Sequence, residues 1–309
     1  MNKKANLNKL NSLLGQGENI IQYLTKNHME DTSVEDEMIS YDLRAGEDIR
    51  RYEQNPELEN RVVEKIKSYI KETGYDAASI VECGSGEGLN LTGIISDKEC
   101  KYSWARGVDI SWSRSFVAQR YSRGKIPENI DADFIVGDFF QLPFKDNSID
   151  IVYTMQGIYG MGGREKTLLT ELYRITKGYL ILIEPSYELG GDNAKKRMER
   201  LGYVKGLPAT ADEMGLNVVK YELFGEDINP LNPAAVLMIK KMAKTAVQDP
   251  LCCPITRTDI ELIGNAYYSK YAMLSYPVLN GIACLTKENA VVASKMNEIY
   301  IDRIEEYEK

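Results

Sequence analysis

The fold is decided by the stretch Ile80-Val81-Glu82-Cys83-Gly84-Ser85-Gly86-Glu87-Gly88. It has the pattern of a buried strand that ends in an acid and a glycine-rich turn and then leads into a helix. Glycines in such a turn let the backbone approach a ligand closely, and open α/β sheets bind their ligands at the carboxyl ends of strands. The stretch therefore predicts a ligand site at the end of a central strand.

The sequence around this stretch alternates between short β-branched runs and helical stretches. The clearest helices are predicted at 56–74, where apolar residues recur every four positions, and at 165–176. Strands are predicted at 79–81, 105–108, 134–136, 149–152, 179–183, 218–224 and 235–239. Alternation of this kind, with nearly continuous apolar strands, predicts a parallel sheet covered by helices on both faces. The fold class is therefore α/β.

Three parts are predicted along the chain. Residues 1–55 are polar, with weak helical spacing, and form an N-terminal helical segment, whereas residues 56–246 form the α/β domain. A boundary falls near Asp249-Pro250, after which turn residues crowd between short strand-like pieces. Residues 247–309 are therefore predicted to form a small α+β module, closed by a helix from Glu288 to the C-terminus.

Charge and composition count against several classes of partner. The formal net charge is −8, and residues 1–60 alone carry twelve Asp/Glu against seven Lys/Arg. A nucleic-acid groove needs Lys and Arg to displace counterions from phosphates, so this charge disfavours DNA and RNA. The five cysteines form no regular framework, no apolar run is long enough to span a membrane, and the N-terminus has no secretory pattern. These features predict a reduced, cytoplasmic protein without a membrane partner, and they leave its oligomeric state open.

Two kinds of cofactor compete for the glycine-rich turn. The dinucleotide fingerprint is G-x-G-x-x-G, with glycine amides and a helix N-terminus facing a pyrophosphate. Here the spacing is G-x-G-x-G, and Glu82 and Glu87 bracket the turn with negative charge. Two carboxylates would repel a pyrophosphate and attract a cation. The turn therefore favours a cationic cofactor, and an NAD-dependent oxidoreductase is disfavoured.

With its acid and its G-x-G-x-G spacing, Glu82–Gly88 resembles the first motif of the class I S-adenosylmethionine-dependent methyltransferases. Further stretches resemble the family in its own order: Gly107–Ser111, Val136–Phe139, Leu142–Phe144 with Ser148–Tyr153, and Ile183–Pro185. The resemblance implies a Rossmann-like, seven-stranded sheet with S-adenosylmethionine as the cofactor. The sulfonium and ammonium groups of that cofactor suit neighbouring carboxylates.

The resemblance also assigns roles to single residues at the cofactor. It gives Asp109 the two ribose hydroxyls and Asp138 the adenine amino group, with Phe139 flanking the ring. The complete predicted cofactor set is Tyr41, Glu82, Cys83, Gly84, Gly86, Asp109, Ile110, Asp138, Phe139 and Met155.

The acceptor side is expected at residues 153–159, at 184–187 and near Tyr41. Histidine is a common general base, and similar methyltransferases often have it where Gln156 stands, but the single histidine here is His28, in the acidic N-terminal segment. Glutamine cannot take a proton, so either Glu184 or Tyr159 serves as the base, or catalysis is mainly proximity. The predicted catalytic residues are Gln156, Tyr159 and Glu184.

Two further segments resemble known modules. Tyr41-Asp42-Leu43-Arg44-Ala45-Gly46 is similar to a segment that precedes related methyltransferase domains, which implies a lid over the cofactor. Cys252–Ile282 resembles the small zinc-knuckle activator of tRNA and release-factor methyltransferases, but only Cys253 stands at a ligand position, and Thr256 replaces the next cysteine. Zinc needs four ligands, so we expect no metal and a module that packs against the main domain, with its cysteines buried.

The sequence therefore predicts a methyltransferase that transfers a methyl group to oxygen or nitrogen of a small-molecule or sugar-type acceptor. One alternative keeps the fold and sends the methyl group to tRNA or protein, as the relatives of the C-terminal module do. Another is a catalytically inactive cofactor-binding partner, which the absence of a base at Gln156 would explain.

Overall fold

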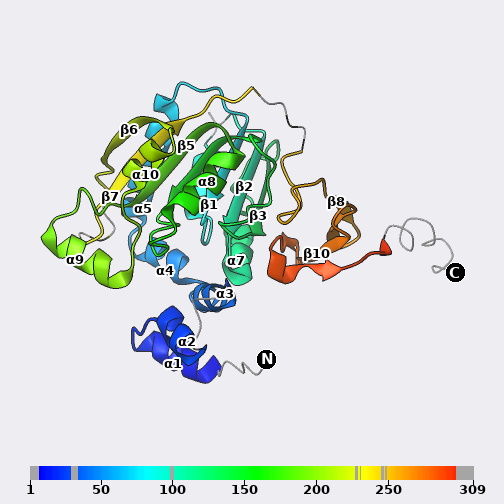
Figure 1. Cartoon of the computed structure of the whole chain (residues 1–309), viewed down its shortest axis with the longest axis horizontal. Coiled ribbons are helices and arrows are strands. Elements are labelled where there is room, and N and C mark those ends of the chain that lie inside the picture. The colour runs from blue at the N-terminus through cyan, green and yellow to red at the C-terminus, as the bar shows by residue number, and fades with distance from the viewer. Residues whose placement is uncertain are drawn as a thin grey trace.

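The computed structural model describes residues 7–28, 34–97, 101–226, 229, 231–244, 247 and 249–296. Its centre is a seven-stranded sheet in the order β3-β2-β1-β4-β5-β7-β6 (Figure 1). The strands are β1 (Ser79–Cys83), β2 (Trp104–Asp109), β3 (Asp131–Val136), β4 (Ile149–Met155), β5 (Thr176–Pro185), β6 (Asn217–Leu223) and β7 (Ala234–Lys240). Strands β1 to β5 pair in parallel, and β7 runs antiparallel to both of its neighbours. The predicted Rossmann-like sheet is confirmed.

Helices cover both faces of the sheet, as the apolar strands predict. They are α5 (Pro56–Glu72), α6 (Leu89–Ile95), α7 (Trp112–Ser122), α8 (Glu165–Ile175), α9 (Asp192–Leu201) and α10 (Leu207–Glu213). Successive strand residues feed opposite cores: Ile80 packs with Val62 and Leu91, whereas Val81 packs with Leu168 and Leu172. A strand with apolar side chains on both faces must be covered twice, and this explains why β1 is fully buried.

The order of the strands reverses beside β1. Strand β2 follows β1 on one side, and β4 joins it on the other, so the connections after β1 and β4 leave in opposite directions. Such a switch point leaves a crevice outside the carboxyl ends of the strands, which is where open α/β sheets bind ligands.

The N-terminal segment is helical, as predicted. It consists of α1 (Leu7–Gly15), α2 (Ile20–His28), α3 (Val34–Asp42) and α4 (Glu47–Gln54). A small core of Leu10, Ile20 and Leu24 joins α1 and α2. Figure 1 shows α3 and α4 below the sheet beside α7, with α1 and α2 further from it. None of the helices in the described ranges is long and apolar enough to cross a membrane.

Helix α3 is fixed to the domain by its last residue. One carboxylate oxygen of Asp42 accepts from the Ser111 hydroxyl and from the Ser113 amide, both at 2.8 Å, and the other accepts from the Ser113 hydroxyl at 2.8 Å. Asp42 therefore caps the N-terminus of α7 from another part of the chain.

We expect Asp42→Ala to lower the free energy of unfolding by about 1–2 kcal/mol, the usual effect of losing an N-cap. It should also speed hydrogen exchange at the amides of Gly46 and Ile49, which belong to the same docked segment and donate to the Glu87 carboxylate. Asn55→Ala is the matched control, because Asn55 caps α5 within its own helix. Equal exchange rates in both variants would contradict a docking role for Asp42.

The C-terminal module is a five-stranded sheet of β8 (Glu261–Ile263), β9 (Ala266–Ser269), β10 (Leu274–Leu279), β11 (Ile282–Ala283) and β12 (Val291–Val292). It is joined to the free edge of the main sheet, where the Leu285 amide donates to the Val136 carbonyl at 2.9 Å. Leu251, Cys253, Tyr276 and Leu285 enter the core under α8. The predicted packing of this module against the main domain is confirmed.

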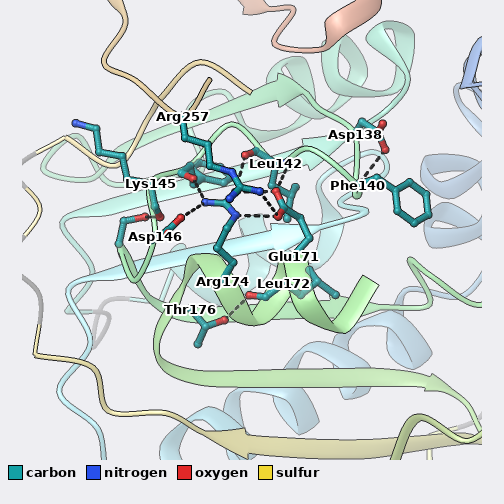
Figure 2. Close-up of polar contacts among 12 residues, drawn as sticks. Asp138, Phe140, Leu142, Lys145, Asp146, Glu171, Leu172, Arg174, Thr176 and Arg257 are labelled. Atoms are coloured by element: carbon teal, nitrogen blue, oxygen red, sulfur yellow. Dashed lines mark hydrogen bonds and ion pairs between the residues drawn. The ribbon is translucent and has the colours of Figure 1, made fainter. Parts of the chain in front are cut away.

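A buried ion pair within α8, between Arg174 and Glu171, lies beside this junction. Figure 2 shows Arg174 donating to the Leu142 carbonyl and to the Glu171 carboxylate, and Arg257 from the module reaches Glu171 at 3.5 Å. Arg174 also donates to the Phe144 carbonyl at 2.6 Å. The Glu171 carboxylate also accepts from the Leu142 amide. Helix α8 and the module thus hold the connection between β3 and β4 that leads away from Asp138.

The prediction of a closing helix from Glu288 is wrong for residues 288–292. Lys287–Asn289 form one 3-10 turn, and Val291 and Val292 pair with Ser275 and Leu274. β-Branched residues beside an open strand edge gain more from pairing than from a helix. Residues 297–309 lie outside the described part of the chain.

The surroundings of Cys253 are hydrogen-bonded. Its sulfur lies 3.1 Å from the Tyr276 hydroxyl and accepts from the Thr256 amide at 3.5 Å. Burial would raise the pKa of this thiol, but the hydrogen bonds from Thr256 and Tyr276 outweigh burial and lower it. Cys252, Cys253 and Cys284 are buried, as predicted. In the described ranges, no three His, Cys, Asp or Glu side chains are grouped as metal ligands.

Candidate functional site

A cavity of about 230 Å³ lies at the switch point of the sheet. Its floor is formed by the ends of β1, β2, β3 and β4, and its cover by α3, α4 and the start of α5. Ten of the thirteen predicted site residues line it: Tyr41, Gly84, Gly86, Asp109, Ile110, Asp138, Phe139, Met155, Gln156 and Tyr159.

Two loops meet at the floor of the cavity. Gly84 has a left-handed backbone with φ of +75°, and a β-carbon on it would lie 2.8 Å from the Cα of Gly157 and 3.1 Å from the ring of Phe139. The turn after β1 and the turn after β4 are therefore in backbone contact, with Phe139 packed over both. Glycine permits this approach because it carries no side chain.

Asp109 connects three parts of the site. One oxygen of its carboxylate accepts from the Gly86 amide and the other from the Ser111 amide, each at 2.9 Å. Arg114 lies 3.7 Å from the same carboxylate. Each carboxylate oxygen can accept two hydrogen bonds, so capacity remains for a diol. The position at the end of β2 suits the ribose role that the sequence predicts.

Asp138 and Phe139 follow β3 at the next position along the cavity wall. The Asp138 carboxylate accepts from the Phe140 amide at 3.0 Å, and burial raises its pKa. A carboxylate beside an aromatic ring can accept from an amino group while the ring stacks on a planar heterocycle. This arrangement suits an adenine ring.

The cover of the cavity is held by charged groups of the N-terminal segment. The carboxylate of Glu87 accepts from the amides of Gly46 and Ile49 at 2.6 and 2.8 Å. Asp48 forms an ion pair with Arg114, and Glu37 one with Arg164 at 2.9 Å. These contacts hold the N-terminal segment over the cavity, where Tyr41 lines the wall.

Orphaned polar atoms show that the cavity suits a polar ligand. Seven side-chain atoms in the described ranges are buried without a partner, and four of them belong to cavity residues: Arg44 Nε, Ser85 Oγ, Asn90 Oδ1 and Arg114 Nε. Buried polar atoms are costly unless a ligand or water satisfies them. Seven carboxylates and three guanidinium groups line the cavity, which matches the two positive charges of S-adenosylmethionine.

Glu82 and Cys83 are predicted cofactor residues that do not line the cavity. The Glu82 carboxylate accepts from the Asn90 side chain and the Leu91 amide, both at 3.1 Å, and burial raises its pKa to about 8. Cys83 is fully buried in the core, and burial raises the pKa of its thiol. Glu82 thus stabilises the start of α6, and this contact gives the acid of the glycine-rich motif a structural role.

The predicted catalytic residues occupy two different places. Gln156 lines the cavity with a left-handed backbone, φ of +52°, and Tyr159 lines it with its ring 4.9 Å from that of Tyr203. Glu184 lies behind them, outside the cavity, and accepts from the Gly157 amide at 2.9 Å and the Ile158 amide at 3.3 Å. Its carboxylate therefore holds the turn that carries Gln156.

Burial raises the pKa of Glu184 to about 7, although the amides of Gly157 and Ile158 favour the charged form. An unfolded Glu titrates near 4.5, so the folded protein binds the extra proton between these values. The contribution of Glu184 to the free energy of unfolding is therefore fully present below about pH 4.5 and is lost as the pH rises through 7. We expect the parent protein to lose stability relative to Glu184→Gln over this range in urea titrations. A pH-independent difference between the two proteins would contradict this.

Sequence reasoning missed Arg44, Arg114 and Glu37 at the cavity. Arg114 stands one turn into α7, five positions after Asp109. Arg114 could have been predicted from its position in the helix, on the side that faces back to the preceding strand. The contacts of Arg44 and Glu37 depend on how the N-terminal segment docks, and no local pattern predicts them.

Comparisons with known proteins agree with this geometry. The family model described as "Methyltransferase domain" matches residues 81–182. A demethylmenaquinone methyltransferase from Renibacterium salmoninarum is 36% identical over 100 residues, which cover 32% of this chain and 41% of that protein. The chain therefore spans about two fifths of this relative.

Among solved structures, the chain is similar to magnesium protoporphyrin IX methyltransferase from Synechocystis PCC 6803 with bound S-adenosylhomocysteine (SAH). The TM-score is 0.51 at 13% identity, and the match covers 66% of this chain and 99% of that one. At this identity the likeness concerns the fold. Residues 81–182 are thus a methyltransferase domain, and the sheet around them is that of the class I S-adenosylmethionine-dependent methyltransferases.

Proposed function

We propose that the protein transfers the methyl group of S-adenosylmethionine to oxygen or nitrogen of a small molecule held under the N-terminal lid. The observation that carries this is the cavity itself: its volume is about 230 Å³, and residues of α3 and α4 cover it. A site that closes over its ligands in this way favours a small acceptor over a folded macromolecule.

The residues of the cavity divide between the two ligands. Asp109 takes the ribose hydroxyls, Asp138 and Phe139 take the adenine ring, and the carboxylate-rich walls attract the cationic centre. Bound there, the cofactor would supply an electrophilic methyl carbon. Its bond to sulfur would break as the acceptor's lone pair forms the new bond, the sulfur would keep the bonding electrons in SAH, and the acceptor's proton would pass to water. Tyr41, Gln156 and Tyr159 remain to orient the acceptor.

Positioning is the main contribution of the chain in this proposal. Gln156 cannot take a proton, and burial raises the pKa of Tyr159, which keeps the phenol protonated as a hydrogen-bond donor. Glu184 lies behind the turn with its oxygens bonded to amides. Holding a nucleophile in line with an activated methyl group can supply much of a transfer rate.

The choice of acceptor class is supported by charge and by the relatives. Glu37, Glu47 and Asp48 of the lid line the cavity, so an RNA backbone approaching it would meet like charge. The two relatives are named for demethylmenaquinone and magnesium protoporphyrin IX, both small molecules. We also propose the division into a lid (1–55), a methyltransferase domain (56–246) and a metal-free module (247–309), in a cytoplasmic protein.

Transfer of a labelled methyl group to a cell extract tests the proposal. After incubation with the protein and labelled S-adenosylmethionine, label should appear in the small-molecule fraction. Label in RNA or protein instead would favour the macromolecular alternative. Tight binding of SAH without label in any fraction would favour an inactive cofactor-binding partner.

A further inference from the structure

Most charged groups of the cavity are paired, and the exceptions among the described residues are Arg44 and the exposed Glu47. Arg51 forms ion pairs with Asp48 and Glu59, and Arg114 with Asp48 and Asp109. Arg44 forms neither an ion pair nor a side-chain hydrogen bond with any described residue, and its Nε is shielded from solvent. A shielded guanidinium nitrogen without a partner is costly unless a ligand or water supplies one.

Arg44 lines the cavity together with Tyr41 and Tyr159, the two phenols that the proposed function assigns to the acceptor. It acts electrostatically on Tyr41 and Tyr159: burial raises the pKa of both phenols, and the charge of Arg44 opposes that rise. Tyr159 follows the turn after β4, opposite the Asp109 and Asp138 side of the cavity. The guanidinium and the two protonated phenols are all hydrogen-bond donors on the wall of one cavity, and a wall with several donors favours an anion.

The amino-acid end of the cofactor has other partners available. Ser85 Oγ, Asn90 Oδ1 and Arg114 Nε are buried without partners around the glycine-rich turn. A hydroxyl and a guanidinium donor suit the carboxylate of that end, and an amide oxygen suits its ammonium. Arg44 is therefore left for the second ligand.

We propose that Arg44 binds a carboxylate of the acceptor, so that the substrate of this enzyme is a small organic acid. This rests on the proposed methyl transfer. An anion entering a cavity lined by seven carboxylates would otherwise be repelled, and a guanidinium can hold a carboxylate by two parallel, charge-assisted hydrogen bonds. Arg44 thus acts as a specificity-determining residue.

The labelled-methyl experiment tests this because it tracks the transferred methyl group, whichever acid in the extract receives it. The small-molecule products are separated on an anion exchanger at neutral pH, with the parent protein, Arg44→Gln and Arg50→Gln compared. Arg50 is an exposed arginine of the same segment outside the cavity lining, and it serves as the matched control. SAH affinity of each protein is measured by calorimetry.

We expect the labelled product to be retained as an acid, and Arg44→Gln to lower its formation by about 10- to 100-fold, with SAH affinity unchanged. Arg50→Gln should behave as the parent. A neutral labelled product would overturn the inference while leaving the methyl transfer intact. An equal loss of SAH affinity in Arg44→Gln would also overturn it, because Arg44 would then belong to the cofactor. No labelled product with the parent protein would count against the proposed function itself.

Discussion

Asp109→Ala should lower the affinity of the protein for SAH by about 10- to 100-fold, the loss expected when charged hydrogen bonds go unmade. The reason is twofold. The variant loses the predicted acceptor for the ribose diol, and it frees the Gly86 and Ser111 amides that the carboxylate now holds. The glycine-rich turn and the start of α7 would then lose their common anchor, and Arg114 would lose one of its two carboxylate partners. Calorimetric titration with SAH measures the effect.

Two further variants make this result interpretable. Asp109→Asn keeps the shape of the side chain but offers one acceptor oxygen, so its affinity should fall between those of the parent and Asp109→Ala. Asp133→Ala removes a carboxylate from the neighbouring strand that accepts from the Phe134 amide and does not line the cavity. It should bind SAH as the parent does. Unchanged affinity in folded Asp109→Ala would remove Asp109 from the cofactor site.

The central sheet could be predicted because its signals are local. Apolar residues on both faces of β1, β4 and β5 require a double cover, and the glycines after β1 mark where the strand must turn. The positions of Asp109 and Asp138 then follow from parallel strands, whose carboxyl ends share one edge. Periodicity and strand order thus suffice for the cofactor half of the site.

The other half depends on long-range pairing, which no local pattern contains. The sequence predicts Glu87 beside a cation; it lines the cavity, and its carboxylate also holds the amides of Gly46 and Ile49, which the sequence does not predict. It predicts Glu184 beside the acceptor, but this residue supports the turn from behind. In both cases the residue type is informative, since a buried carboxylate needs donors. Which donors it finds is decided only when distant segments meet.

Two glycines with the same local backbone conformation differ in what surrounds them. Gly84 and Gly124 both have a left-handed backbone, with φ of +75° and +73°. A β-carbon on Gly84 would lie 2.8 Å from the Cα of Gly157, whereas one on Gly124 would meet nothing within 4 Å. Alanine at either position carries the same backbone strain, about 1–2 kcal/mol. Only Gly84 adds a steric clash.

We therefore expect Gly124→Ala to lose about 1–2 kcal/mol in the free energy of unfolding while binding SAH normally. Gly84→Ala should lose a further 1–3 kcal/mol or so, the usual effect of overpacking, because the contact is with backbone and cannot be relieved by a side-chain rotation. Its SAH affinity should fall by about 10-fold or more, since separating the turns after β1 and β4 displaces Phe139, whose ring packs on both. Urea unfolding and calorimetry on the two variants measure both quantities. Equal stability losses, or normal SAH affinity in Gly84→Ala, would show that the two turns are free to separate and that their contact does not shape the cofactor site.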